Sequence, residues 1–538
     1  MSGMYTSLYQ GLHPLLAAAA TAVATPPAPA VSSPATTGSG SFPTILVSTS
    51  LLAPAVAFLL VLLFPERSAD WQRRMRLATF FGVGVAAILA LYAVWSQITN
   101  LSAPGTNYVF EETYHWWSGG VVPVDYQVGL DGISIPVLAV LMLILFGVAL
   151  STWKVGERVK LYCLSLLAVV FCVVGLLCSI NLVLLVAFWA LFLPSIAGLI
   201  WASPGLRRRD AESGGAPWRS LALRSMVAAT AFPCGILLQV VLTRSGSVGP
   251  ALSTLHPAIM MVAFWLTFVG AAIMVPLIPL YPLQFPSARS WLGTRMVLLA
   301  VVPSVALYLV LRVDLGLFAT AAAHMHLVLA LIGSLTALWA GIRAVVSSSP
   351  RAAAVSAALL LFGAVIFAFG VQTSIALTGS VFMLCGAALT VGLLTLLSAA
   401  FDERAAARRA TELEAFFVHG PVFARLGLLA LLSAAGVPFM STFLGLLLII
   451  SGGLFADRIL TLVLLAGFLL HVVGFARMGA LQLRPGGEES VQAPDASARE
   501  LAVVSPILIG MVLFGIFPGL LTEMVGNGMA TILARLGG

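Results

Sequence analysis

Three histidines lie inside long apolar runs of this sequence, where few other side chains can ionise: His324, His326 and His471. Imidazole changes its charge near neutral pH, so a histidine in apolar surroundings can take up and pass on a proton. The alternative is that each ring bonds backbone or hydroxyl groups and helps helices to pack, and the cost of burying ionisable groups favours this alternative. His324 and His326 are two residues apart and point to different faces of a helix, so they cannot form one relay site alone.

A second feature is a series of prolines that follows an uncharged apolar run beginning near residue 256: Pro276, Pro279, Pro282 and Pro286. Proline removes a backbone donor and clashes with the carbonyl one turn back, so a helix cannot run straight through this stretch. In lipid the freed carbonyls need partners, and broken helices of this kind commonly mark the ion or substrate site of a transporter. A simple kink that shapes packing is the alternative.

The composition indicates which class of protein holds these residues. Of the 538 residues, 60% are hydrophobic and 9% are charged, and the mean hydropathy is +1.06. No soluble domain could hide so much apolar surface, so we expect a polytopic protein of the lipid bilayer. The net charge of +7 comes from arginines in short loops without a basic run interleaved with aromatics, which argues against nucleic-acid binding.

Cofactor and metal motifs are missing from the sequence. Its five cysteines lie in apolar runs without metal-ligand spacing, and we interpret them as small buried hydrophobes. There is no glycine-rich phosphate loop, no dinucleotide fingerprint and no CxxC pair. Redox cofactors, if any matter, are therefore expected on another chain.

Hydropathy predicts about fourteen membrane-spanning helices. They lie near residues 46–64, 77–97, 132–152, 161–180, 182–203, 220–243, 257–281, 290–311, 315–342, 352–371, 374–400, 421–452, 459–476 and 501–521. Alternate loops and span ends carry twenty-three of the 27 lysines and arginines, and the other side holds only four. By the positive-inside rule, this asymmetry places both termini outside.

The chain divides into five stretches by composition. We interpret residues 1–42 as a flexible leader rich in Pro, Ser, Thr and Gly. A signal peptide is the alternative, but the lysine or arginine that usually precedes its apolar run is missing. The other stretches are the first two spans in 43–106, an outer amphipathic loop in 107–136, a transport-like core in 137–480, and a cytoplasmic loop with the last span in 481–538.

The outer loop ends in a specific motif, Val128-Gly129-Leu130-Asp131-Gly132-Ile133-Ser134. It closely resembles the VGxDGIS-like motif that precedes the third helix in M-type (chain 4) membrane subunits of respiratory NADH:quinone oxidoreductase, complex I. In that family a short amphipathic stretch leads into the motif. Gly129, Asp131, Gly132 and Ser134 are the positions that carry the match.

The resemblance continues in order to the C-terminus and covers roughly residues 107–538. Met274-Val275-Pro276 with Pro279 resembles the family's broken helix seven. Gly436-Val437-Pro438 followed by Phe443-Leu444-Gly445 resembles the broken helix twelve. Because Pro276 and Pro438 lie five helices apart, the second break is inverted relative to the first. We therefore expect an all-α membrane fold with two inverted five-helix repeats, each with a proline-broken helix, similar to complex I and Mrp antiporter-like subunits.

Carried over residue by residue, the family's proton-carrying positions lack titratable groups in this sequence. The resemblance implies a glutamate, two lysines, a histidine or lysine and a second glutamate in the membrane interior; the matching residues are Ala190, Met274, Ser304, Gly386 and Leu446. Both lysines of the chain, Lys154 and Lys160, fall in one cytoplasmic loop. The acidic residues fall in loops or at span ends, with Asp131 and Asp314 at the outer border.

These observations support two functional hypotheses. The first is an M-type subunit that takes part in proton translocation, with the three histidines as its remaining pathway. The second, which the missing charges favour, is a non-catalytic membrane-arm module with a degenerate channel. A related assembly, such as a membrane-bound hydrogenase or a multi-subunit cation/proton antiporter, is a third possibility. The resemblance implies L-type and N-type neighbours, a bacterial plasma membrane, and NADH, FMN, iron–sulfur clusters and quinone bound on partner subunits.

Overall fold

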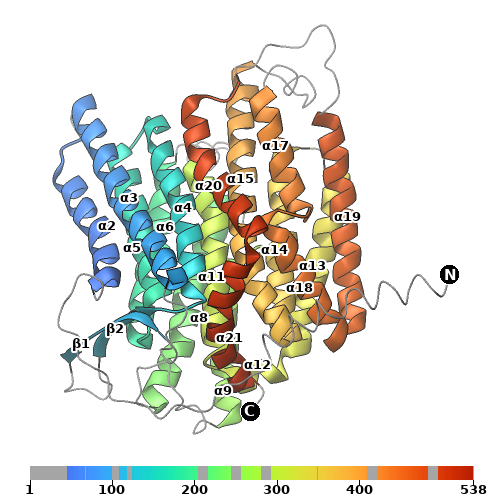
Figure 1. Ribbon diagram of the computed structural model, residues 1–538. Helices are drawn as coiled ribbons and strands as arrows, with labels where there is room; N and C mark the ends of the chain where they lie inside the picture. The colour runs from blue at the N-terminus through green and yellow to red at the C-terminus, as the bar shows by residue number, and fades with distance from the viewer. Residues whose placement is uncertain are drawn as a thin grey trace.

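The computed structural model describes residues 45–66, 68–99, 108–117, 124–203, 216–243, 256–279, 292–347, 349–408, 421–482 and 495–536. The predicted leader and two of the prolines, Pro282 and Pro286, lie outside these ranges. The described chain is a bundle of long helices with one small β-hairpin at its lower end in Figure 1. We call this the hairpin end and the opposite one the far end.

The first part of the chain forms a series of separate helices followed by one continuous helix in several segments. The individual helices are α2 (Leu46–Leu63), α3 (Ala69–Thr99), α4 (Ser134–Ser151), α5 (Val159–Cys178), α6 (Leu182–Ala202), α8 (Ala216–Thr243) and α9 (Pro257–Ala272). One continuous helix then runs from residue 292 to residue 315 and contains two π-helical turns; its segments are α10 (Leu292–Met296), η5 (Val297–Val301), α11 (Val302–Leu309) and η6 (Val310–Leu315).

The second half contains α12 (Ala319–His324), α13 (His326–Val346), α14 (Pro350–Val371), α15 (Ser374–Arg408), α17 (Pro421–Ala434), α18 (Ser441–Ala456), α19 (Arg458–Gln482), α20 (Ala498–Ile516) and α21 (Pro518–Leu536). Within the described residues, twelve helices are long and apolar enough to cross a membrane, and α9, α17 and α18 are shorter apolar helices. Each predicted span coincides with one of these helices or with a pair, and the count of fourteen crossings stays a prediction.

The centre of the bundle is formed by α14 and α15, whose apolar stretches are almost completely buried. Helices α2, α3, α19 and α20 lie at the periphery and expose large apolar side chains, as a protein surrounded by lipid or by other membrane subunits does. The burial pattern therefore follows the hydropathy of the sequence only in part, because apolar side chains cover both the inside and the outside.

Backbones touch where α13 crosses α19. A Cβ atom added to Gly467 of α19 would lie 2.5 Å from the carbonyl oxygen of Ala337 on α13, which is closer than a side chain tolerates. One turn on, Gly341 of α13 faces the backbone of Gly467 in the same way. Small residues at such crossings allow helices to approach closely in a membrane.

The outer loop forms a β-hairpin that the sequence analysis did not predict, in a described chain that is otherwise helical. Strands β1 (Val109–Trp117) and β2 (Val124–Leu130) pair antiparallel, with Tyr114 opposite Tyr126. The hairpin is joined to the bundle where the amide of Ile180, between α5 and α6, donates to the carbonyl of Gln127 at 3.0 Å. Its position is therefore fixed by main-chain bonds and not only by its aromatic side chains.

Two further helical features differ from the predicted spans. The span expected at 315–342 is interrupted at Met325, so that α12 and α13 are separate helices. The last span ends at Ile516, and Pro518 begins another helix, α21, that the sequence analysis did not anticipate. Helix α21 returns to the hairpin end, where it contacts α12 and α3 (Figure 1).

Candidate ion-translocation site

The first candidate site lies where α9 ends. The helix stops at Ala272, and the amides of Met274 and Val275 continue only as tight turns that donate to the carbonyls of Ala271 and Ala272, each at 3.0 Å. Pro276 and Pro279 lie in the non-helical chain that follows. Between them the amide of Ile278 donates to Oγ1 of Thr336 on α13 at 3.2 Å. A side chain of a neighbouring helix thus satisfies a backbone group that the break leaves without its helical partner.

The second candidate site lies between α17 and α18. Gly436 has a φ of +65°, and Pro438 lies in the turn that separates the two helices. The carbonyl of Ser433, in the last turn of α17, accepts a hydrogen bond from the hydroxyl of Thr442 on α18. Oγ of Ser433 lies 2.7 Å from Oγ1 of Thr390 on α15. Hydroxyl groups therefore bridge this break, and none of them titrates in the physiological range.

The five substituted family positions do not form one cavity. Ala190 is exposed on the surface of α6, and Met274 is half-buried in the first break. Ser304 is fully buried, and its hydroxyl donates to the carbonyl of Ala300 in its own helix at 2.6 Å. Leu446 is buried against Gly436 in the second break.

Gly386 shows why a side chain is missing at one of these positions. A Cβ atom there would lie 2.6 Å from the carbonyl oxygen of Ser441 and 3.1 Å from the amide of Thr442. Helix α15 therefore passes so close to the start of α18 that there is no room for a side chain. The histidine that the resemblance implies at this position does not fit this backbone.

The three predicted pathway histidines lie in different environments. His324 and His326 are exposed on either side of the α12–α13 break, with Nδ1 2.7 Å and 2.8 Å from the carbonyl oxygens of Thr320 and Ala323. His471 is fully buried in α19, and its ring stacks on Phe475 with centroids 4.1 Å apart. Its ring faces the backbone of Ala340 on α13 without a well-formed hydrogen bond.

The VGLDGIS motif is the centre of a polar cluster at the hairpin end. Oδ1 of Asp131 accepts from the amides of Ile133 at 3.2 Å and Ser134 at 2.8 Å, so it caps the start of α4. Its other oxygen, Oδ2, accepts from Nη1 of Arg312, and Nη2 of the same guanidinium donates to the hydroxyl of Tyr108 at 2.8 Å. Gly132 has no room for a Cβ atom because the carbonyl of Met524 on α21 covers it.

Electrostatics keep this cluster charged. Burial alone would raise the pKa of Asp131, but the Arg312 guanidinium and the hydrogen bonds from Ser134 outweigh burial and hold the pKa below its usual range. Burial raises the pKa of Tyr108, so its hydroxyl stays neutral and acts as an acceptor for Arg312. Both partners of the ion pair are thus fully charged at neutral pH.

A second carboxylate of the hairpin caps another helix. The amides of Val47 and Ser48, at the start of α2, donate to Oε1 of Glu112 at 2.9 Å and 3.1 Å. The hydroxyl of Ser48 lies 2.9 Å from that of Tyr126, whose pKa is raised to about 12 by burial and by the nearby Glu112 charge, against the Ser48 hydrogen bond. The motif residues and the hairpin acids therefore hold helix ends in place.

Ion pairs also join helix ends at the far end. Asp402 near the end of α15 accepts from Nη1 of Arg295 on α10 at 2.5 Å and from Nε of Arg351 on α14 at 2.8 Å. Lys154 lies 3.4 Å from Glu500, which forms a capping box with Ser497 at the start of α20. These charges lie at the helix ends and not along the breaks.

The sequence analysis predicted a different environment for one buried carboxyl group. Asp314, expected at the outer border, is completely buried in η6 against Thr267 of α9. Thr267 is the eleventh residue of the sixteen in α9, roughly 15 Å along the helix from its start. The only signal in the sequence was a lone acid that closes an apolar run, and the family comparison drew attention to other positions.

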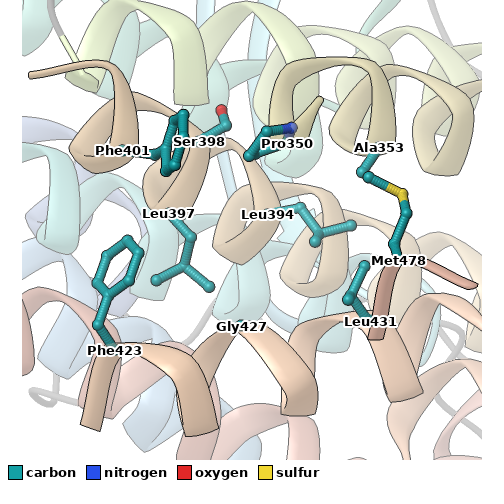
Figure 2. Close-up of a pocket in the computed structure, with 10 residues that line it drawn as sticks. All are labelled: Pro350, Ala353, Leu394, Leu397, Ser398, Phe401, Phe423, Gly427, Leu431 and Met478. Carbon is teal, nitrogen blue, oxygen red and sulfur yellow. The ribbon is translucent and has the colours of Figure 1, made fainter. Parts of the chain in front are cut away.

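An apolar pocket between α14, α15, α17 and α19 offers no alternative substrate site (Figure 2). Pro350, Leu397 and Phe401 are among its lining residues, and its one side-chain hydroxyl, that of Ser398, already donates to the carbonyl of Thr395 at 2.8 Å. Its volume of about 30 Å³ has room for about one or two water molecules. Within the described ranges, no group of three His, Cys, Asp or Glu residues could hold a metal ion.

Comparison with known proteins places this fold. The profile of a family described as "NADH:quinone oxidoreductase/Mrp antiporter, TM" matches residues 179–470, which is more than half of the chain. The chain belongs to this family. The match covers both breaks and all five of the family positions named above. The NADH:quinone oxidoreductase/Mrp antiporter family match therefore includes the part of the chain that holds both candidate sites.

Individual members of the family are similar over nearly their whole length. NADH-quinone oxidoreductase subunit M of Rickettsia bellii is 20% identical over 498 residues, which is 91% of this chain and 99% of that protein. A chain of respiratory complex I from Thermus thermophilus has the same fold, with a TM-score of 0.78 and 20% identity over 91% of this chain and 100% of its own. A chain of the Mrp complex from a Dietzia species matches with a TM-score of 0.73 and 19% identity over 93% and 100%.

Proposed function

We propose that this chain is an M-type (chain 4) membrane-arm subunit of an NADH:quinone oxidoreductase assembly in a bacterial plasma membrane. The end-to-end similarity to a subunit M and the VGLDGIS motif support this assignment. The exposed apolar faces of the peripheral helices suit L-type and N-type neighbours as well as lipid. NADH, FMN, iron–sulfur clusters and quinone then bind on partner subunits, and the arginine distribution puts both termini outside.

Within that assembly we assign the chain a mainly structural role, with a degenerate proton channel. The observation that carries this assignment is the replacement of all five family positions by side chains that do not titrate, in a chain that keeps the fold and both helix breaks. Proton transfer through a membrane needs ionisable groups along the path. The close approach of α15 to α18 at Gly386 supports the same conclusion, because it leaves no space for a relay side chain.

The likeness to an Mrp complex chain favours a second candidate, a subunit of a related assembly such as a multi-subunit cation/proton antiporter or a membrane-bound hydrogenase. The partners distinguish the two. We would add an affinity tag to the full chain, purify it from its own membranes in mild detergent and identify the co-purifying subunits by mass spectrometry. Co-purification of NADH-oxidising subunits with L-type and N-type proteins supports complex I, whereas antiporter subunits alone contradict it.

The structural role is tested by proton translocation per electron pair in inverted vesicles that contain the assembled complex. The variant replaces His324, His326 and His471 by apolar residues, and the amount of assembled complex is measured first. An unchanged ratio is the expected result. A ratio lower by about one proton in a complex that still assembles would show conduction through the histidines, and the structural role would then be wrong.

A further inference from the structure

Asp314 is a buried acid that the proposed function does not use. Its side chain has no exposed surface, and Oδ2 has no hydrogen-bond partner among the described residues. Oδ1 lies 2.5 Å from Oγ1 of Thr267 on α9. An ionised carboxylate that is removed from water needs several donors or a cation, and a single hydroxyl does not replace them.

The charged and titratable side chains of the surrounding helices are directed elsewhere. Arg312, on the same helix, binds Asp131 and Tyr108. Tyr308 of α11 donates to the carbonyl of Leu177 at 3.0 Å, and His324 of α12 is exposed. Arg535 of α21 donates to the main-chain carbonyl of Gly316. Helix α9 contains no charged or titratable residue, and among the described residues no cation forms an ion pair with Asp314.

The hydroxyl of Thr267 indicates where a proton resides. Its oxygen lies 3.0 Å from the carbonyl oxygens of both Ala263 and Phe264 in the preceding turn, in addition to its contact with Asp314. A hydroxyl has one proton to donate and two lone pairs to accept with. If Thr267 donates to a backbone carbonyl, its lone pair is free to accept the proton of a neutral carboxylic acid. This arrangement leaves only the uncharged carbonyl oxygen Oδ2 without a partner, which costs less than leaving a carboxylate oxygen unpaired.

We propose that Asp314 and Thr267 form a buried proton-binding site that is occupied at neutral pH. The bound species is a proton on Oδ1, which converts the carboxylate into a carboxylic acid that donates to Thr267. On release, the carboxylate returns and the Thr267 hydroxyl turns to donate to it. The site lies between α9 and η6, apart from the five substituted family positions, and it does not depend on which assembly the chain joins.

Infrared spectroscopy of the assembled complex in lipid nanodiscs tests this site, because a protonated carboxyl absorbs apart from a carboxylate. At neutral pH we expect a protonated-carboxyl band that shifts in D₂O and on labelling with [¹³C]aspartate. The band disappears in Asp314→Asn, which is nearly isosteric with the neutral acid. Thr267→Val moves the band to higher wavenumber because the acid loses its acceptor, and Thr267→Ser restores it.

Asp402→Asn is the matched control, since Asp402 accepts from two arginines and its replacement should alter only the carboxylate region. The labelling of the wild type needs no variant, so the absence of a labelled protonated-carboxyl band overturns the proposal even if a substitution prevents assembly. If no aspartate band lies in the protonated region, or if Asp314→Asn removes a carboxylate band instead, the proposal is wrong. A protonated band that vanishes when sodium ions are added at constant pH would also overturn it, because the site would then bind a metal cation.

Discussion

The carboxylate of Asp131 caps α4 with one oxygen and binds the guanidinium of Arg312 with the other. This one side chain thus joins the loop after the hairpin, the start of α4 and the end of the helix that spans residues 292–315. Gly132, between the hairpin and α4, and Ser134, the first residue of α4, serve the same junction. The most specific sequence motif of the chain is therefore a structural joint.

Arg312→Leu should strongly destabilise the protein. The substitution leaves the Asp131 carboxylate buried without its cation, and breaking one side of a buried pair costs about 3–5 kcal/mol. Thermal unfolding of the purified complex measures the effect, and Arg458→Leu, at an exposed position, is the control. Equal melting temperatures for the two variants would contradict the importance of the pair.

The contribution of Asp131 should depend on pH in a defined direction. Because the pKa of Asp131 is lower in the folded protein than its ordinary value of 3.8 in an unfolded chain, the stability that Asp131 contributes is fully present above pH 3.8. It is lost as the pH falls through the lower folded-state pKa. The difference in melting temperature between wild type and Asp131→Asn should therefore be constant near neutral pH and shrink below about pH 4. A difference that stays constant into strong acid would speak against this ion pair.

Thr336→Val should loosen the first break. The substitution removes the acceptor of the Ile278 amide, and an unsatisfied buried donor costs about 1–3 kcal/mol. Hydrogen exchange should become faster in the peptide that contains Ile278, while Thr336→Ser should exchange like wild type. If the valine and serine variants exchange alike, water or another group satisfies this amide.

Gly386→Ala should destabilise the packing of α15 against α18 by about 1–3 kcal/mol, because the new methyl group meets the backbone of Ser441. Gly392→Ala in the same helix is the control, since the nearest atom to a Cβ there is 3.7 Å away. Thermal unfolding should separate the two variants, and we expect Gly386→His, which introduces the side chain that the resemblance implies, to prevent assembly. A stable Gly386→His protein would mean that the helices can move apart.

Much of the helical framework could be predicted from the sequence, because long apolar runs leave few alternatives in a membrane. The end of α9 before Pro276 is an example, since proline acts locally. The break at Met325 has no proline or glycine beside it, and the side chain of Gln372 donates to the carbonyl of Ala322 in the turn before it. The hairpin was missed because residues 109–117 show no clean alternation and strand pairing is a long-range property.

The candidate site was harder to predict because it, too, depends on contacts between residues far apart in the sequence. The sequence identifies which side chains are present, but burial and partners decide what they can do. His324 and His326 lie inside an apolar run but are exposed, whereas Asp314, expected at the outer border, is completely buried. Only the position of Thr267 opposite Asp314 gives that acid its chemistry.

The glycine contacts between α13 and α19 have a mechanical consequence. Where backbone lies directly on backbone, no side chain can change its rotamer to absorb a displacement of one helix relative to the other. We therefore expect helices α13 and α19 to move together as one rigid unit. A displacement of α19 should then displace α13 as well, and with it the Thr336 hydroxyl that accepts from the Ile278 amide.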